Sequence, residues 1–419
     1  MIIMKHKTKK FAAFVGLDWA DKKHDVSIWA PDSAPVHHEI QNTPESLNDW
    51  LQSLRKQYPD GQIALCFEGS KSGLLFHLMG YDFVTIFQVN PKSMARFREA
   101  FTPSGAKGDQ SDADFLREIV VNYHESLSPW EPDDEQTRMI ALLAIDRRKA
   151  VEERTRLTNR LLANLKMYFP QAIKLAGETL YSPLAIDFFH KWPQLADIQK
   201  SKEATVRKFY LSHNSRSKTL IEERVSLVRS TIPITKDQAI IKSSILKTQM
   251  IVGQLAQLSK AIILYEAELE NMYKHHPDKD IFDSFPGAGP ALGPRLLAAW
   301  GSNRKRFDSA QSMQKFSGIA PIIIASGNSK RVLRRLACPK FILQTFHEFA
   351  NCSRASSSWA EAYYKMQCKH GKSHHIAIRA LAFKWIRIMF KCWQNKTKYN
   401  EAVYLKQLIK TKSPMLEFL

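Results

Sequence analysis

The sequence predicts a mixed α/β domain followed by two largely helical regions, and three observations support this fold class. Residues 11–123 alternate short apolar runs with helix-like segments, residues 133–275 contain little strand signal, and residues 279–399 open on a glycine-containing turn before a helix-like stretch. A chain of 419 residues is long enough for two or three hydrophobic cores. We therefore expect three domains, at residues 1–130, 131–277 and 278–419.

The composition restricts the class of protein and of partner. Lys and Arg number 61 against 41 Asp and Glu, a formal charge of +20 that implies a polyanionic partner or an anionic surface. Five scattered cysteines without a CxxC pair argue against a disulfide framework or a zinc ribbon and favour a reducing compartment. The sequence offers no run of about 18 apolar residues for a membrane helix. We expect a cytoplasmic protein with no membrane partner.

The first domain shows strand signals, then strands that alternate with helices. The apolar segments 11–18 and 24–30, separated by a polar turn, predict a hairpin, and 36–41 predicts a third strand. Thr43 followed by Pro44 is typical of a helix start. Two short apolar runs, 63–67 and 83–88, suit buried parallel strands. Together these elements predict a mixed sheet with helices on both faces.

The middle region is predicted to be helical. Residues 135–168 contain no Gly or Pro, and residues 236–273 are interrupted by Gly253 alone. Apolar residues of the second stretch follow a heptad spacing, which fits a coiled coil of about four heptads. An amphipathic helix packed inside its own chain fits that spacing equally well. Residues 172–230 mix aromatic, proline and basic residues, and their pattern predicts no particular structure.

Basic residues and glycines of the last region are candidates for nucleic-acid binding. Gly287 and Gly289, before a helix-like stretch, resemble a helix-hairpin-helix turn that grips a phosphate through backbone N–H groups, although ordinary helical hairpins use Gly in the same way. Residues 362–400 contain no acidic residue. The candidate cations are Lys330, Arg331, Arg334, Arg335, Arg379, Lys384, Arg387 and Lys391. A solvated charged face is the alternative, but it would normally carry acids as well.

Four carboxylates are candidates for a metal site. Asp18 and Glu68 each end an apolar strand, and adjacent strand ends would bring them to one edge of the sheet. Asp109 and Asp112 lie three residues apart at the start of a helix-like stretch and therefore share one helical face. Hard carboxylate oxygens suit two Mg²⁺ or Mn²⁺ ions, which can clamp a phosphodiester. Taken singly, each residue is explained equally well as a turn residue, a helix cap or a first-turn acid.

Ser326 is the candidate nucleophile. It follows the apolar run 322–325, precedes Gly327, and lies close in sequence to the cluster of cations at 330–335. A hydroxyl on a flexible turn beside guanidinium groups can attack a phosphodiester whose charge those groups stabilise. The alternative is a strand-to-helix turn in which Ser326 or Ser329 caps the next helix.

Segments at both ends of the chain resemble the DEDD transposases, the Piv-like recombinases of the insertion-sequence one-ten (IS110) family. The N-terminal segments are Val15-Gly16-Leu17-Asp18-Trp19-Ala20, Phe67-Glu68-Gly69-Ser70 and Lys107-Gly108-Asp109-Gln110-Ser111-Asp112-Ala113. The C-terminal segments are Phe285-Pro286-Gly287-Ala288-Gly289-Pro290, Phe316-Ser317-Gly318-Ile319-Ala320-Pro321 and Ser326-Gly327. Two features depart from the family: Ala325 stands where members often have Ser, and the middle region is longer, with 172–230 as a possible insertion.

The resemblance implies a fold and a reaction. The N-terminal domain would be ribonuclease H-like, related to the RuvC junction resolvase, with Asp18, Glu68, Asp109 and Asp112 as metal ligands. Ser326 would join covalently to a DNA end. The expected partners are donor and target DNA, a structured guide (bridge) RNA, and further copies of the chain in a dimer or tetramer with a composite site. Two alternatives remain: a RuvC-like junction nuclease that uses water, and a catalytically idle nucleic-acid-binding protein.

Overall fold

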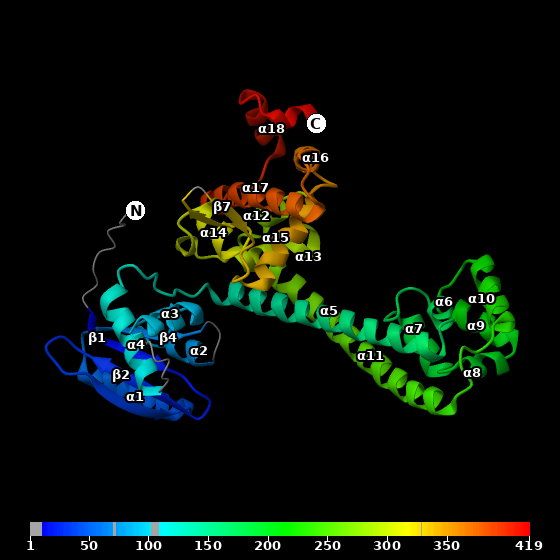
Figure 1. Cartoon of the computed structure of the whole chain (residues 1–419), viewed down its shortest axis with the longest axis horizontal. Helices are drawn as coiled ribbons and strands as arrows, with labels where there is room; N and C mark the ends of the chain where they lie inside the picture. Colours follow the sequence, from blue (N-terminus) through cyan, green and yellow to red (C-terminus); the bar gives the residue numbers. More distant parts are fainter. Residues whose placement is uncertain (1–10, 70–72, 102–108, 328) are drawn as a thin grey trace. The chain divides into compact units, whose positions relative to one another are not determined.

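The chain consists of two compact units, Met1–Pro132 and Asp133–Leu419. The computed structural model describes residues 11–69, 73–101, 109–327 and 329–419. The first unit contains a sheet with helices, whereas the second is almost entirely helical (Figure 1). The predicted combination of an α/β domain with helical regions is therefore confirmed, and the division of the helical part at residue 277 stays a prediction.

The first unit is built on a five-stranded mixed sheet of order β3-β2-β1-β4-β5. Its strands are β1 (Phe11–Asp18), β2 (Lys23–Trp29), β3 (Val36–Gln41), β4 (Gln62–Glu68) and β5 (Val84–Val89). The first three strands pair antiparallel, as the hairpin signals predict, and β4 and β5 continue the sheet in parallel with β1. The sheet thus presents the carboxyl ends of three parallel strands at one edge.

Helices cover both faces of this sheet because the central strands are apolar on both sides. The helices are α1 (Pro44–Gln57), α2 (Gly73–Leu78), α3 (Pro91–Phe101) and α4 (Asp109–Tyr123). Thr43 caps α1 by accepting a hydrogen bond from the Ser46 N–H. One core contains Leu51 of α1 with Val15 and Leu65, and the other contains Leu116 of α4 with Cys66.

A glycine lets α4 lie directly on β1. A Cβ atom at Gly16 would come within 2.0 Å of the Ala113 carbonyl oxygen and 2.3 Å of the Arg117 nitrogen. Near the other end of the helix, the ring of His124 contacts the rings of Phe11 and Phe14 at the start of β1. The helix therefore runs antiparallel to β1, and its N-terminal turn lies toward the carboxyl edge of the sheet.

Two long antiparallel helices, α5 (Glu135–Tyr168) and α11 (Gln238–Lys274), run along each other in the second unit (Figure 1). Gln136 donates to the Met272 carbonyl near one end, and Asn164 donates to the Ser244 carbonyl near the other. The heptad residues Leu255, Ile262 and Leu269 are buried within the chain. The structure shows this helix packed along α5 of its own chain, and a coiled coil stays a prediction.

Residues 172–230 form short helices at one end of the long pair (Figure 1). They are α6 (Ala172–Ala176), α7 (Pro183–Lys191), α8 (Leu195–Lys200), α9 (Glu203–Ser212) and α10 (Lys218–Ser230). Phe188, Trp192 and Tyr210 pack with Leu161 of α5 and Leu255 of α11 in one hydrophobic core. The segment that sequence could not place is thus an ordered helical bundle.

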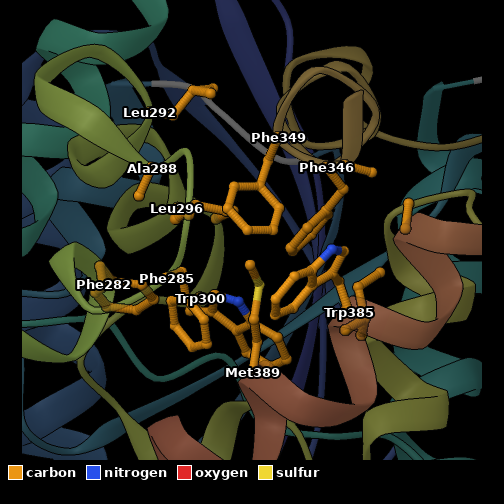
Figure 2. Close-up of a cluster of buried hydrophobic side chains, with 14 of the residues drawn as sticks. Phe282, Phe285, Ala288, Leu292, Leu296, Trp300, Phe346, Phe349, Trp385 and Met389 are labelled. Atoms are coloured by element: carbon orange, nitrogen blue, oxygen red, sulfur yellow. The ribbon is translucent and has the colours of Figure 1, made fainter. Parts of the chain in front are cut away.

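The rest of the second unit is a helical domain with one small hairpin. Its helices are α12 (Lys279–Asp283), α13 (Gly289–Trp300), α14 (Ala310–Phe316), α15 (Lys340–Ser353), α16 (Ser358–Lys369), α17 (His374–Asn395) and α18 (Glu401–Lys410), with 3₁₀ turns η1 (Arg304–Arg306) and η2 (Pro414–Phe418). Figure 2 shows its core, in which Phe285, Trp300, Phe349 and Trp385 converge. Among the described residues, no helix is long and apolar enough to cross a membrane.

Candidate active site and nucleic-acid surface

Asp18 and Glu68 end neighbouring parallel strands at the same register. Leu17 of β1 pairs with Phe67 of β4, and each carboxylate residue comes directly after one of these partners. Side chains alternate along a strand, so Asp18 lies on the same face as Gly16, the face that α4 covers. Both residues are half-buried. The sheet therefore holds two carboxylates side by side at its carboxyl edge, beneath the start of α4.

The other two candidate ligands belong to the first turn of α4. Asp109 is the first residue of this helix, and its side chain lies outside the described residues, as do Lys107 and Gly108 of the same motif. Asp112 is only 5% exposed, and its two oxygens accept hydrogen bonds of 2.8 and 2.6 Å from Arg98 of α3. Among the residues that the structure describes, no group of three or more His, Cys, Asp and Glu is arranged to hold a metal ion.

Arg98 is a residue of this edge that sequence reasoning missed. It lies on a different helix, 14 residues before Asp112, so no local spacing connects the two. A buried carboxylate requires a counter-charge, and the bidentate Arg98 supplies it. From sequence, Arg98 could have been suggested only by asking which nearby cations are able to neutralise the predicted acids.

Asp114, the next acid of α4, has a structural role. Its Oδ1 accepts a 2.7 Å hydrogen bond from Ser27 of β2 and lies 2.9 Å from Arg117, which is itself buried. These contacts attach the helix to the sheet in the same turn of α4 that packs on Gly16. Asp112 and Asp114 are therefore not merely solvated first-turn acids, because each is held by a specific cation.

Ser326 lies at the tip of an antiparallel hairpin formed by β6 (Ile322–Ser326) and β7 (Ser329–Leu333). It pairs with Ser329, and both are exposed. The alternative in which either serine caps the following helix is wrong, since the chain enters a second strand and the next helix starts only at Lys340, after Pro339. Asn328, in the turn, lies outside the described residues.

Cations surround this hairpin. Lys330 and Arg331 are exposed on β7, and Arg334 and Arg335 follow it directly. Arg379 of α17 donates to the Gly318 carbonyl; burial, followed by the nearby charge of Arg334, lowers the pKa of Arg379. The guanidinium groups of Arg334, just after the hairpin, and of Arg379 on α17 therefore lie near each other, although 45 residues separate them in sequence.

The three predicted cations of α17 differ in their surroundings. Arg387 and Lys391 are exposed. Lys384 lies 4.7 Å from the centre of the Tyr363 ring, and burial, followed by the charge of Arg387, lowers its pKa. Two of the three side chains are thus available to a polyanion, whereas the third is partly used in packing.

The two glycines of the α12–α13 turn also differ. Both have left-handed backbones, with φ of 80° at Gly287 and 53° at Gly289. A Cβ atom at Gly287 would lie 2.8 Å from the backbone of Cys352, so this glycine serves the packing of the turn against α15. Gly289 faces open space at the N-terminus of α13. Of the pair, only Gly289 presents an uncovered side to a phosphate.

The charge of the chain is divided unequally between its units. Residues 1–132 contain 14 Lys and Arg against 17 Asp and Glu, whereas residues 133–419 contain 47 against 24. The whole basic excess thus belongs to the second unit, together with the hairpin and α17. A polyanion will be attracted mainly to that unit.

Two family models match the chain, in order along the sequence. One, described as a transposase of the IS110 DEDD type, matches residues 15–170, and the other, described as a transposase of the IS116/IS110/IS902 family, matches residues 279–365. The first match includes the four carboxylates, and the second includes the hairpin with Ser326. Together they cover 243 of the 419 residues, more than half of the chain.

Curated relatives carry related descriptions. A mini-circle putative transposase for IS117 from Streptomyces coelicolor is 28% identical over 93% of this chain and 95% of its own length. A putative transposase of Sinorhizobium fredii is 27% identical over 48% of this chain and 57% of its own length. An uncharacterised 42 kDa protein of insertion element IS900 from Mycobacterium paratuberculosis is 24% identical over 71% of this chain and 73% of its own length.

Proposed function

Because this chain belongs to the IS110 family of DNA transposases, we propose that it cuts and rejoins the DNA strands of an insertion sequence with Ser326 as nucleophile and a carboxylate metal site in its first unit. The observation that carries the proposal is the position of Ser326, which is exposed at the tip of a cationic hairpin. A serine there can reach the backbone of a polyanion without rearrangement of a core.

The proposed chemistry conserves the phosphodiester bond. The Ser326 Oγ attacks phosphorus and loses its proton, the bond between phosphorus and the leaving strand breaks, and the leaving oxygen takes up a proton. The DNA end remains esterified to the protein until the hydroxyl of another strand attacks it in the reverse sense. Covalent catalysis thus divides one exchange into two transfers and needs no nucleotide cofactor. Arg331, on the same face of the hairpin as Ser326, would hold the phosphate and offset its charge.

The donor atoms at the carboxyl edge fit a divalent cation. Asp18, Glu68, Asp109 and Asp112 would supply carboxylate oxygens, the ligands that Mg²⁺ or Mn²⁺ prefers. Such ions would contribute Lewis-acid stabilisation of the phosphate's developing charge. Asp112 would exchange Arg98 for the metal, and in the metal-free protein Arg98 keeps this carboxylate oriented and neutralised. The strand order β3-β2-β1-β4-β5 supports the RuvC-like, ribonuclease H-like assignment of this unit.

The proposed partners are donor DNA, target DNA and a structured guide RNA, with the chain acting as a dimer or tetramer in the cytoplasm. The basic excess of the second unit supports polyanionic partners. Its exposed cations lie on both the hairpin and α17, so it offers more than one surface to nucleic acid.

The decisive experiment compares Ser326→Ala with Ser329→Ala, because these exposed serines pair across the same hairpin tip. Labelled element-end DNA is incubated with protein, Mg²⁺ and the RNA transcribed beside the gene, and the products are separated under denaturing conditions. We expect a covalent protein–DNA adduct with the wild type and with Ser329→Ala, and neither adduct nor cleavage with Ser326→Ala.

Other outcomes identify the rival functions. Cleavage by Ser326→Ala with no adduct in any variant would assign the chain to the water-using nucleases. DNA binding without cleavage by the wild type, across divalent metals, would leave only the nucleic-acid-binding role.

A further inference from the structure

The β6–β7 hairpin exposes apolar side chains on both of its faces. Ile323 and Val332 lie opposite each other and are 58% and 64% exposed. On the other face, Ile324 and Leu333 are 49% and 44% exposed. An isolated two-stranded hairpin is only marginally stable in water, and contiguous exposed apolar surface usually marks a binding surface. We call Ile322–Ser326 together with Ser329–Leu333 the ribbon.

The charge around the ribbon identifies the class of its partner. Between Asp308 and Glu348 the sequence has no acidic residue, but it has six cations. They are Lys315, Lys330, Arg331, Arg334, Arg335 and Lys340. An acid-free cationic surface is complementary to nucleic acid. The ribbon's partner therefore carries phosphates as well as apolar surface, and stacked bases provide that surface.

The residue types on the ribbon indicate how it meets the bases. Recognition of base edges in the major groove uses Arg, Asn, Gln and similar hydrogen-bonding side chains. Here two of the five cross-strand pairs, Ile322–Leu333 and Ile323–Val332, are aliphatic on both strands, and Ile324 and Ala325 add an aliphatic side chain on one strand. Proteins that place aliphatic side chains against DNA in this way insert them between base steps, which unstacks the bases and bends the duplex.

The cations are arranged to hold the two strands of such an opened step. Lys330 and Arg331 are consecutive in β7, so their side chains point to opposite faces of the ribbon. Arg331 shares its face with Ile324 and Ser326. A ribbon that enters a duplex would therefore carry one cation toward each backbone, with the serine on one of these faces.

We propose that the ribbon unstacks a base step of duplex DNA next to the phosphodiester that Ser326 attacks. The position of that step rests on the proposed function, because it assumes that Ser326 is the nucleophile. The unstacking itself does not depend on that assumption. Opening the step would separate bases that must change partners when strands are exchanged. The free energy spent on unstacking is offset by burial of Ile323, Val332 and their neighbours against the bases.

The test uses the paired substitutions Ile323→Ala and Val332→Ala in one protein. The matched control is Ile263→Ala with Leu264→Ala, which removes two equally exposed side chains from α11. Both variants alter exposed positions, so their thermal unfolding should match the wild type. The fluorescent base 2-aminopurine is placed at successive steps of element-end DNA, where its emission rises when stacking is lost.

We expect a severalfold rise in emission at one step with the wild type, the control and Ser326→Ala, and no rise with the ribbon variant. The ribbon variant should keep its affinity for the duplex within about threefold, because its cations remain. It should fail to cleave fully paired DNA and regain most of its cleavage on a substrate with two mismatched pairs at that step.

Three results would overturn the proposal. The first is a rise in 2-aminopurine emission with the ribbon variant as large as with the wild type. The second is loss of cleavage by the ribbon variant on paired and mismatched DNA alike. The third is a change in the oligomeric state of the DNA-free ribbon variant in sedimentation, which would assign the ribbon to contact between copies. A rise with both the wild type and Ser326→Ala, but no covalent adduct in the wild type, would instead refute the serine mechanism and leave the unstacking proposal standing.

Discussion

Asp112 is buried in the first turn of α4, with both oxygens bound by Arg98. In this state each carboxylate oxygen accepts one hydrogen bond from Arg98, and we expect a metal that uses the same lone pairs to replace the guanidinium. Removing one partner of a buried ion pair typically costs about 3–5 kcal/mol, because the other charge is left without compensation. Arg98 therefore reports on whether Asp112 is a metal ligand.

The variant Arg98→Gln should lower the melting temperature of the metal-free protein. Adding Mn²⁺ should raise the melting temperature of this variant by more than it raises that of the wild type. The metal would supply the positive charge that the variant lacks, and binding to the folded state adds stability. Arg117→Gln is the matched control, because Arg117 pairs with Asp114, which is not a candidate ligand. Equal Mn²⁺ shifts in both variants, measured by calorimetry, would exclude Asp112 from the site.

His276 gives a prediction about pH. Its Nδ1 accepts a hydrogen bond from the Asp278 N–H, so the neutral ring carries its proton on Nε2, which contacts Thr137. Burial lowers its pKa below the ordinary 6.5. The unfolded chain binds this proton at higher pH than the folded one, so stability due to His276 is lost as pH falls below 6.5.

Denaturant unfolding at pH 7.5 and 5.5 tests this effect. The fall in unfolding free energy between the two pH values should be smaller in His276→Gln than in the wild type, although the variant is less stable at both. The same fall in both proteins would show that His276 does not set the acid sensitivity.

At the scale of elements, α17 combines packing with an interaction surface. We predict that Arg387→Ala with Lys391→Ala lowers the slope of log affinity against log salt for duplex DNA by about 1.8, or 0.9 for each lost phosphate contact. Lys384→Ala should lower it by less, because this side chain packs on Tyr363. Lys56→Ala on α1 is the control, and filter binding at several salt concentrations measures all four slopes. An unchanged slope in the double variant would show that Arg387 and Lys391 form a solvated face that does not contact DNA.

Helices and strands marked by a local sequence pattern, such as an apolar run or a capping residue, were predictable from sequence. Other elements were not. The strand Phe11–Asp18 and the helix Glu135–Tyr168 have the predicted bounds, because an apolar run and a long stretch free of Gly and Pro define them locally. Helices α6–α10 were not predicted, because they are short and owe their stability to aromatic packing between segments distant in sequence. The β6–β7 hairpin did have a signal, since Gly327-Asn328 shortly after the β-branched run 322–324 is typical of a two-residue turn.

The candidate site was predictable in part for the same reason. Strand ends and a three-residue spacing are local patterns, so Asp18, Glu68 and Asp112 could be selected from sequence. The pairing of Asp112 with Arg98 depends on how α3 and α4 pack, and the exposure of the ribbon depends on what the fold leaves uncovered. Neither property is written in a short stretch of sequence.

For the whole molecule, the unequal charge of the two units predicts where nucleic acid binds. Lysine acetylation of the protein with and without element-end DNA should show protection mostly in Asp133–Leu419, including Lys330 and Lys391. Lysines of the first unit, such as Lys56 and Lys92, should stay reactive, because that unit carries more acids than bases. Mass spectrometry of the acetylated peptides gives the pattern. Equal protection of both units would contradict the prediction that their unequal charge directs nucleic acid to the second unit.

The antiparallel arrangement of α5 and α11 also has an evolutionary consequence. The chain leaves along one helix and returns along the other, so everything from α6 to α10 begins and ends at neighbouring points, as the bond from Asn164 to Ser244 shows. Codons inserted or deleted between these points change the length of the α5–α11 pair and the size of the α6–α10 bundle. The core at the opposite end, around Trp300 and Phe285, keeps its own contacts. Such a lineage can acquire or discard an accessory module in one recombination event, which is the kind of event that its own product would catalyse.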